Sequence, residues 1–449
     1  MKKLALINPG RRVQYVSVEP LGLECIAAYI QKYGVDVKII EEPAGQDVRS
    51  RILKYKPDIV GITGMTPIIL DSYRIADMCR KMGIRTVIGG VHATILPEEA
   101  LQHADIVVTG EGEIAMRDII QQDVKSGIIK GTPVKNLDDI PIFDRSKIDM
   151  DFHMRMTASI FQCAPPGALA TCIFTQRGCN YRCTFCHNSW SNLPYRCNSA
   201  GRVIDEIQYL VKQYHVKVIS FQDDNLFMNK PRVKEICQKL INSNMSIIWA
   251  CNARVDNVDS DILKLAYQAG CRQIFFGLES GSQRMLDVLN KKTTIEQNIK
   301  AIQMCHEIGI RVTSTFMIGN PTETVEDIRM TQQFIKDNPI DDSAIAFTTP
   351  LPGTQIWEWG RERGLIPEHP DWSKFDFRAI GYSACDTIPS SQLEMLYRES
   401  SLLVASTQKR ISLKWLISMY ARFPVQMTAI FLRSTSWTKY KSRLSIKGG

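Results

Sequence analysis

The sequence has no long apolar run. Among its 449 residues, no stretch of 18 or more apolar residues is available to cross a membrane as a helix. The first apolar stretch, LALIN, is too short for the core of a secretion signal and leads directly into the turn residues Pro9 and Gly10. No segment is of low complexity, and the composition, 44% hydrophobic and 23% charged, is that of a globular protein. At this length we expect two or three domains, because a single core stops growing well below it.

The thirteen cysteines show no pairing symmetry along the chain. Without a secretion signal, such a pattern is typical of a reducing compartment, where thiols bind metals or lie in the core rather than form disulfides. We therefore expect the protein in the cytoplasm.

Acidic residues are absent from residues 401–449, which carry nine Lys or Arg side chains, whereas the first 400 residues are almost neutral, with 46 basic and 47 acidic side chains. This tail also contains Trp415, Phe431 and Trp437, and Pro424 interrupts it. A basic, aromatic-rich segment is typical of contact with an anionic membrane surface, here the inner face of the membrane, or of a cover over a hydrophobic substrate. The alternative is a helical cap with a solvated basic face, and nucleic acid is the weakest candidate partner.

Short apolar runs alternate with amphipathic helical patterns in the first part of the chain. The runs LALIN, DVKII, DIVGIT, RTVIGG and DIVVTG have the length and composition of buried strands. This alternation predicts an α/β fold, with a doubly wound, Rossmann-like domain over residues 1–135. A stretch with Gly, Pro and Asp follows, and residues 136–165 are expected to form a linker.

A second alternating series begins near Ala168, with the strand patterns LATCIFT, VKVISF, SIIWAC, RQIFFG, VTSTFMIG and AIAFTT. Six strand-helix units predict a partial, TIM-like (β/α)6 barrel over residues 166–365, followed by a basic helical C-terminal region over residues 366–449. In such barrels the chemistry lies on loops after the carboxyl ends of the strands, so the functional residues are expected there.

One such loop contains three cysteines. The stretch GCNYRCTFCHNSW, just after the first strand pattern of the barrel, holds Cys179, Cys183 and Cys186 within eight residues. Thiolates are soft ligands suited to iron-sulfur clusters, and three of them leave one iron of a four-iron cubane open to an outside ligand. Zinc with His187 as a fourth ligand is an alternative, although a His next to a Cys ligand is awkward for one ion. Unligated thiols are the remaining alternative.

The spacing C-x3-C-x2-C, with Phe185 just before the last cysteine, resembles the signature of radical S-adenosylmethionine enzymes. The resemblance implies a 4Fe-4S cluster whose open iron is chelated by the amino and carboxylate groups of S-adenosylmethionine. It also implies an electron donor such as flavodoxin or ferredoxin, because an electron from the cluster cleaves the sulfonium to a 5′-deoxyadenosyl radical.

Polar residues follow the next two strand patterns. Asp223 and Asp224 are candidates for holding an amine or transferring protons, or for capping a helix. Arg254 is a candidate for pairing with the carboxylate of the methionine moiety, against the alternative of a surface salt bridge.

The following two strands end similarly. Glu279 and Ser280 are candidates for binding ribose hydroxyls, or for capping a helix. Gly319 allows the backbone to approach an adenine, and Glu323 adds a charge at the start of the next helix. Together these positions resemble the radical enzyme barrel over about 180 residues.

The first domain resembles the cobalamin-binding domain of cobalamin-dependent radical S-adenosylmethionine proteins. The stretches DIVGITGMT, IGGVHAT and VVTGEGE stand at its strand ends. Their glycines fit a corrin or its nucleotide tail across the carboxyl edge of the sheet: Gly61, Gly64, Gly89 and Gly90. The alternative is tight turns without a ligand.

This resemblance includes one departure. Many cobalamin proteins use a D-x-H-x-x-G loop after the first strand for a lower axial histidine, but here that loop reads NPGRRVQYV. We therefore expect a lower face without a histidine from this loop. His92, the first histidine of the chain, is placed near the corrin or phosphate, or is an uninvolved solvated residue. Glu111 is assigned to the same cofactor site, with helix capping as its alternative.

The function that these resemblances imply is methylation of an unactivated carbon, in which the adenosyl radical removes a hydrogen and the substrate takes a methyl group from methylcobalamin. The substrate is expected to be a small or lipid-like molecule. The alternatives are radical cyclisation, oxygenation or rearrangement without methyl transfer, and a non-enzymatic cobalamin or redox sensor. A methylthiotransferase is disfavoured, because only Cys25 and Cys79 are available in residues 1–150 for a second cluster.

Overall fold

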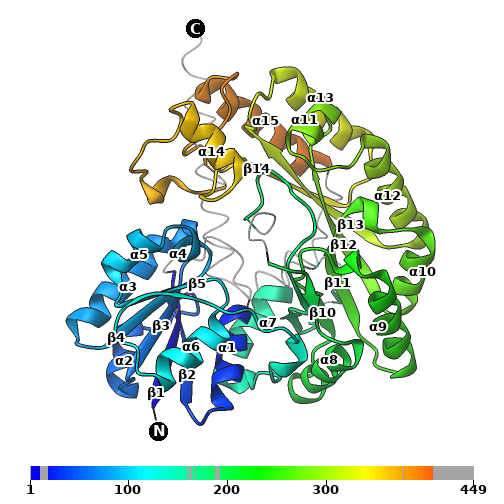
Figure 1. Cartoon of the computed structure of the whole chain (residues 1–449). Helices are drawn as coiled ribbons and strands as arrows, with labels where there is room; N and C mark the ends of the chain where they lie inside the picture. The colour runs from blue at the N-terminus through cyan, green and yellow to red at the C-terminus, as the bar shows by residue number, and fades with distance from the viewer. Residues whose placement is uncertain are drawn as a thin grey trace.

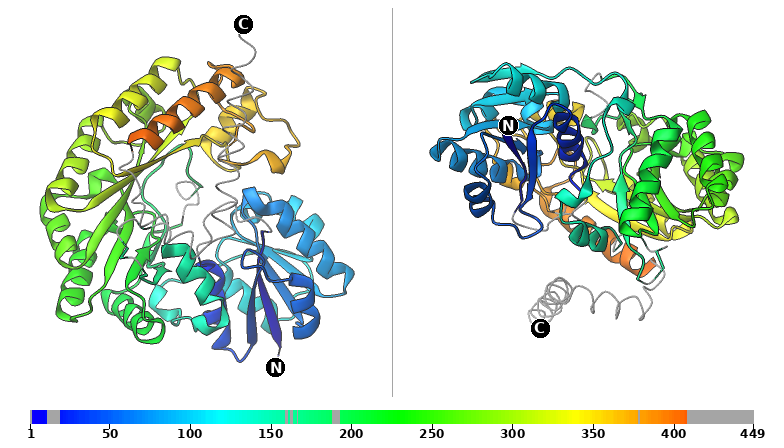
Figure 2. Two further views of the ribbon diagram at one scale, coloured as in Figure 1. Left: turned by 180° about the vertical axis from the view of Figure 1, so that it is seen from behind. Right: turned by 90° about the horizontal axis from the view of Figure 1, so that it is seen from below.

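The fold is given by a computed structural model that describes residues 2–10, 19–158, 161, 164–165, 167–187, 193–377 and 379–407. These residues form two α/β units that lie side by side (Figures 1 and 2). Each unit is built on a six-stranded parallel sheet.

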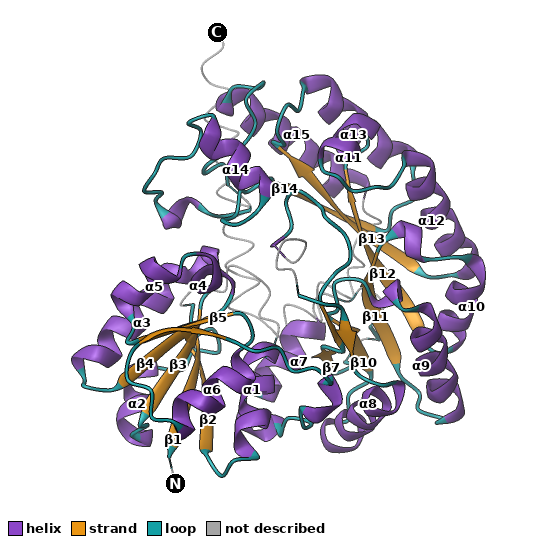
Figure 3. Cartoon of the chain, viewed as in Figure 1, coloured by secondary structure: helices purple, strands orange, loops and turns teal. Residues whose placement is uncertain are grey.

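The first unit has the strand order β2-β1-β3-β4-β5-β6. Its strands are β1 (Lys3–Asn8), β2 (Asp36–Glu41), β3 (Ile59–Thr63), β4 (Arg85–Gly89), β5 (Ile106–Thr109) and β6 (Gly127–Lys130). The helices that accompany them are α1 (Leu21–Gln31), α2 (Val48–Tyr55), α3 (Ile69–Lys81), α4 (Val91–Ile95), α5 (Pro97–His103) and α6 (Gly112–Gln121), on both faces of the sheet (Figure 3). The predicted doubly wound domain is confirmed. Because the order reverses at β1, a ligand crevice is expected beyond the carboxyl ends of β1 and β3.

The second unit has the order β14-β13-β12-β11-β10-β7, with β7 and β14 at its two edges. Its strands are β7 (Ala170–Ile173), β10 (Val218–Phe221), β11 (Ile248–Ala253), β12 (Cys271–Glu279), β13 (Arg311–Ile318) and β14 (Asp342–Phe347). The connecting helices are α8 (Ala200–Tyr214), α9 (Lys230–Asn242), α10 (Ser260–Gln268), α11 (Gln283–Val288), α12 (Ile295–Ile308) and α13 (Val325–Asp337). The predicted partial barrel is confirmed, and all six of its strand patterns form strands of one sheet.

Residues 136–165, for which a linker was predicted, contain the helix α7 (Met150–Ala158). This helix packs on the edge strand β7 of the second sheet. A short antiparallel hairpin, β8 (Gln176–Arg177) and β9 (Arg196–Cys197), brackets the cysteine loop.

After the second sheet come α14 (Gln355–Glu362) and α15 (Ser390–Thr407). Helix α15 packs against β14 and α13, and Figure 2 shows it along the outside of the partial barrel. The basic tail that follows, including Trp415, Phe431 and Trp437, lies outside the described residues. Within the part of the chain that the structure describes, no helix has both the length and the apolar character to cross a membrane.

Candidate active site

The three cysteines lie in the loop that follows β8, at the carboxyl end of the barrel. Cys179 and Cys186 are half-buried, and Cys183 is 6% exposed. Backbone contacts fix the loop, since Cys186 N donates to Cys183 O at 3.2 Å and Thr184 N donates to Leu289 O at 3.0 Å. The sequence therefore placed this loop correctly at a strand end.

Burial raises the pKa of both Cys179 and Cys183. For Cys183, the positive charges of Lys291 and Arg254 act in the opposite direction. For Cys179, the negative charges of Asp224, Cys186 and Cys183 add to the increase. The three thiols lie in one short loop, and the buried cations Lys291 and Arg254 favour the ionised form of Cys183 against the effect of burial on its pKa.

This donor set fits a cluster better than a single metal ion. In the described ranges, no three or more His, Cys, Asp or Glu side chains are arranged to hold one metal ion. Thiolates that each bind a different iron of a cubane need to be further apart than ligands of one zinc. Three thiols suit such a cluster, and His187 directly after Cys186 stays awkward as a fourth ligand of one zinc ion.

Arg254 follows β11 and is 7% exposed. Its Nε and Nη2 donate to the two carboxylate oxygens of Asp256 at 3.0 and 3.1 Å, and its Nη1 donates to Cys183 Sγ at 3.7 Å. The guanidinium also lies 3.6 Å from the ring centroid of Tyr181. Arg254 therefore forms a buried ion pair, not a surface salt bridge, and it contacts the cluster loop.

Lys291 was not singled out by the sequence, because it stands inside a loop after α11 rather than at a strand end. Its Nζ donates to Glu279 Oε1 at 2.7 Å and lies 5.7 Å from the ring centroid of Phe185, next to the last cysteine. Glu279 adopts a left-handed conformation with φ of 63°, at an irregularity in the pairing of β12 with β13. A non-glycine residue in this region is strained, and such strain often marks a functional position.

Ser280 and Gly319 lie at the same end of the barrel. The Ser280 hydroxyl pairs with Thr331 Oγ1 of α13 at 3.1 Å and accepts from Ser282 N at 3.1 Å, so it links the turn after β12 to α13. Gly319 has φ of 91°, which requires glycine, and its N donates to Glu323 Oε2 at 2.6 Å. Burial raises the pKa of Glu323 to about 7, and its Oε1 has no hydrogen-bond partner among the described residues.

Asp223 and Asp224 differ sharply in environment. Asp223 is fully buried, and its Oδ1 accepts from Thr175 N at 2.6 Å and from Gln176 N at 2.9 Å. Asp224 is exposed, near enough to Cys179 to influence its pKa. Asp223 therefore ties the segment after β10 to the start of the hairpin, and of the two only Asp224 faces solvent beside the cluster loop.

The first unit contains a cavity of about 220 Å³ at the carboxyl edge of its sheet. Its lining includes four residues predicted for cobalamin, namely Gly61, Gly89, Gly90 and Glu111. A Cβ on Gly61 would lie 2.9 Å from Leu6 Cδ2 and 3.1 Å from Met116 Cε, so glycine keeps this space open. The cavity is a cradle of the kind that the nucleotide tail of cobalamin requires.

Gly64 and His92 are not part of that lining. Gly64 packs on Gly90. A Cβ added to Gly90 would lie 2.6 Å from Gly64 O. His92 is fully buried, with Nδ1 3.1 Å from Thr66 Oγ1 and Nε2 3.4 Å from Glu99 Oε1. The expectation of a solvated His92 is therefore wrong, because the side chain is enclosed by α3, α4, α5 and the edge of Trp372.

Glu111 was predicted at the cofactor, with helix capping as its alternative, and its side chain makes no cap hydrogen bond. Its carboxylate instead pairs with Arg177 at 3.1 Å and with Arg196, the two arginines of the β8-β9 hairpin. Burial would raise the pKa of Glu111, but the hydrogen bond from Arg196 and the charge of Arg177 outweigh it and lower the pKa. Neither arginine was singled out by the sequence, because their partners lie more than 60 residues away.

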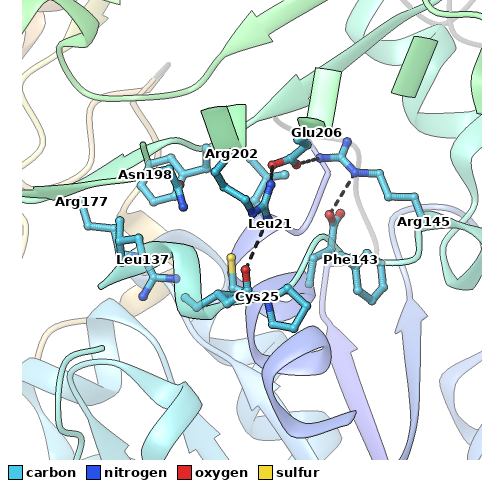
Figure 4. A pocket seen from close by; sticks show the side chains of 13 residues that line it. Leu21, Cys25, Leu137, Phe143, Arg145, Arg177, Asn198, Arg202 and Glu206 are labelled. Atoms are coloured by element: carbon cyan, nitrogen blue, oxygen red, sulfur yellow. Dashed lines mark hydrogen bonds and ion pairs between the residues drawn. The ribbon is translucent and has the colours of Figure 1, made fainter. Parts of the chain in front are cut away.

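A second cavity lies between the two units, and Figure 4 shows the charged residues around it. Arg145 donates to Glu19 at 2.7 Å, pairs with Glu206 at 3.1 Å and lies 3.5 Å from Glu24. We call Glu19, Glu24, Arg145 and Glu206 the interdomain charge cluster. It was not predictable from the sequence, because its members come from a loop, α1, the segment before α7, and α8.

A doubly wound unit with a glycine-lined cavity at the carboxyl edge of its sheet, placed beside a partial barrel with a three-cysteine loop, defines the class of cobalamin-binding radical S-adenosylmethionine enzymes. The comparisons agree. The chain matches the radical SAM superfamily over residues 173–335 and the B12 binding domain over residues 11–120.

Individual relatives extend over most of the chain. An uncharacterized methyltransferase of Pyrococcus horikoshii is 30% identical, with 84% of this chain and 86% of that protein covered. The anaerobic magnesium-protoporphyrin IX monomethyl ester cyclase of Rubrivivax gelatinosus is 30% identical, with 80% of this chain and 68% of the cyclase covered. The methyltransferase TsrM of Kitasatospora setae shares the fold, with a TM-score of 0.68 at 17% identity, over 82% of this chain and 78% of TsrM.

The chain therefore belongs to the cobalamin-dependent radical S-adenosylmethionine enzymes. Its cofactors are a 4Fe-4S cluster, S-adenosylmethionine and cobalamin. It is an enzyme of a methyltransferase family, rather than a non-enzymatic sensor.

Proposed function

We propose that this enzyme methylates an unactivated carbon of a hydrophobic small molecule. Cobalamin supplies the methyl group, and the cluster with S-adenosylmethionine supplies a 5′-deoxyadenosyl radical. The observation that carries the proposal is the cavity of the first unit, which shares the lining residues Phe174 and Arg177 with the barrel. Arg177 lies two residues before Cys179, so a corrin above this cavity would face the cluster loop. Both reactive groups could then reach one substrate.

Several of the predicted residues have a role in this proposal. Cys179, Cys183 and Cys186 hold the cluster. The nucleotide tail of cobalamin enters the cavity past Gly61 and Gly89, while Glu111 keeps the hairpin at its rim. The adenosine and methionine moieties lie against the carboxyl ends of β12 and β13 and the cluster loop, where the candidates are Phe185, Glu279, Ser280 and Gly319.

A tetrapyrrole or a terpenoid lipid is the substrate class that we propose first. The Rubrivivax relative is named for a magnesium-protoporphyrin ester, and the tail of this chain is basic and rich in apolar residues. A flavodoxin or ferredoxin would supply the electron. The same tail motivates a cytoplasmic location with contact to the inner face of the membrane.

The first prediction tests the chemistry. With S-adenosylmethionine labelled in its methyl group, a reductant and a candidate tetrapyrrole, we expect labelled product together with S-adenosylhomocysteine and 5′-deoxyadenosine in about equal amounts. Equal amounts follow because one S-adenosylmethionine supplies the methyl group and another supplies the radical. Mass spectrometry of the product and liquid chromatography of both by-products measure the outcome. An unlabelled but transformed product without S-adenosylhomocysteine would reject methyl transfer.

That rejecting outcome defines the second candidate, a radical cyclase or oxygenase that uses no methyl group. It is favoured by the Rubrivivax relative, which is named as a cyclase and matches 80% of this chain. The cluster and the barrel would serve both reactions, so the by-product analysis separates the two candidates.

A further inference from the structure

Arg254 is buried and directs its side chain at residues of the cluster loop and its surroundings. Each of its three guanidinium nitrogens donates to a named partner: Nε to Asp256, Nη2 to Asp256 and Lys291 O, and Nη1 to Cys183 Sγ. Its plane is stacked 3.6 Å from the centroid of Tyr181, which belongs to the cluster loop itself. This side chain therefore contacts the loop at two of its residues.

Neighbouring residues fix Arg254 in place. Asn225 Oδ1 accepts from Arg254 N at 3.3 Å, and Asn225 Nδ2 donates to Asn257 Oδ1 at 2.5 Å. The same Asn257 oxygen accepts from the Tyr181 hydroxyl at 2.9 Å. The ends of β10 and β11 thus support the ring and the guanidinium together, so the direction of Nη1 toward Cys183 is set by the scaffold.

The charged groups beside Cys183 have a fixed arrangement, with the positive Arg254 between the sulfur and the negative Asp256. Asp256 contacts the Nε and Nη2 side of Arg254, while Nη1 faces the sulfur. In a buried site, a hydrogen bond and a positive charge at a cluster sulfur stabilise the form with more negative charge, and hydrogen bonding to sulfur is one of the factors that set cluster potentials. Reduction of a 4Fe-4S cluster adds one electron and no proton, so this contact favours the reduced form.

We propose that Arg254 is a positioning residue that raises the reduction potential of the cluster by donating Nη1–H to the ligating sulfur of Cys183. The proposal rests on the assignment of Cys183 as a cluster ligand, which is part of the proposed function. It replaces the carboxylate-binding role that the sequence suggested for Arg254.

Two variants test the sign of the effect. Arg254→Gln removes the charge, and Asp256→Asn keeps Arg254 but removes its counter-charge. At a fixed solution potential near the wild-type midpoint, we expect the ratio of reduced to oxidised cluster to fall about tenfold in R254Q, equivalent to about 59 mV for one electron. In D256N we expect this ratio to rise. Anaerobic redox titration followed by EPR of the reduced cluster measures it, with iron and sulfide analysis for normalisation.

Arg272→Gln is a matched control. Arg272 also stacks on a tyrosine, 3.9 Å from the centroid of Tyr267, and donates to backbone carbonyls at the amino end of β12. We expect an unchanged ratio in R272Q, since that end of the strand is opposite to the cluster loop.

An unchanged ratio in R254Q with full iron content would overturn the proposal, and so would shifts of the same sign in R254Q and D256N. If R254Q fails to bind iron, D256N decides: a raised ratio supports the proposal and an unchanged ratio overturns it. Absence of a cluster in the wild-type protein would instead reject the proposed function.

Discussion

At the scale of single residues, two neighbouring aspartates show how position decides a role. Asp223 accepts hydrogen bonds from Thr175 and Gln176, and burial raises its pKa to about 6 although Thr175 and the charge of Arg232 oppose this. Asp224 is exposed. The pair could not be separated in the sequence, because both follow the same strand.

The second prediction compares these two residues. Asp223→Ala leaves two buried backbone N–H groups and a hydroxyl without their acceptor, so we expect the free energy of unfolding to fall by about 2–4 kcal/mol. Asp224→Ala removes an exposed side chain and is expected to change it by no more than about 0.5 kcal/mol. Urea unfolding of the apoprotein, followed by circular dichroism, measures both. Equal losses in the two variants would contradict the assigned role of Asp223.

At the scale of elements, the carboxyl end of β3 determines whether the first unit can take a cofactor. Gly61 lies opposite Leu6 of β1 and Met116 of α6, and all three line the cavity. Larger residues at this position would occupy the space, whereas the flexible ends of Leu6 and Met116 would allow the sheet itself to persist.

The third prediction is that Gly61→Val lowers cobalamin affinity at least about tenfold, or about 1.4 kcal/mol. Equilibrium dialysis of cobalamin, followed by its absorbance, measures the dissociation constant. The control is Gly201→Ala in α8, where an added Cβ would have only Ser199 Oγ at 3.8 Å as a neighbour. Wild-type cobalamin affinity in the Gly61 variant would show that the nucleotide tail of cobalamin does not enter this cavity.

Elements were easier to predict than contacts. The strands of the second sheet each contain buried apolar residues that mark them in the sequence, so all of them were found. Strand β6 is short, with alternately half-buried and exposed residues, and was missed. The position of Cys179 followed from the rule for strand ends. The contacts of Lys291 with Glu279 and of Arg177 with Glu113 were not predictable, because they depend on how distant segments approach one another.

At the scale of the whole molecule, the interdomain charge cluster joins the two units. Arg145 is almost fully buried and faces three carboxylates, of which Glu206 also pairs with Arg202. Glu24 makes the longest of these contacts, and in the part of the chain that the structure describes its Oε1 has no hydrogen-bond partner. Burial raises the pKa of Glu24 to about 8, although the charge of Arg145 opposes this. Glu24 is therefore the carboxyl that keeps its proton near pH 7.

The fourth prediction concerns pH. A carboxyl whose pKa is raised on folding binds its proton more tightly in the folded state, so its contribution to stability is complete below the unfolded pKa of about 4.5 and is lost as pH rises toward 8. Glu24→Gln cannot ionise, so we expect its free energy of unfolding to exceed that of the wild type by about 1–3 kcal/mol at pH 9.

Urea unfolding at pH 5, 7 and 9 measures this difference. Glu206→Gln is the control, and it should lower stability at pH 7 because it weakens contacts with Arg145 and Arg202, each at 3.1 Å. A pH dependence in the Glu24 variant equal to that of the wild type would contradict the assignment.

The contacts of Glu19 have a consequence for synthesis on the ribosome. Its carboxylate accepts from Arg145, from the Thr171 hydroxyl and from Cys172 N, residues that are translated 126, 152 and 153 positions later. A nascent chain that has completed β6 but not Arg145 lacks all three of these partners, and one that ends before β7 still lacks Thr171 and Cys172. Glu19 therefore gains its full set of hydrogen bonds only once the barrel has begun. A fragment that ends at residue 135 would lack these partners permanently. We therefore expect the first unit to reach its full stability only in a chain that extends past β7, beyond the last strand of its own sheet.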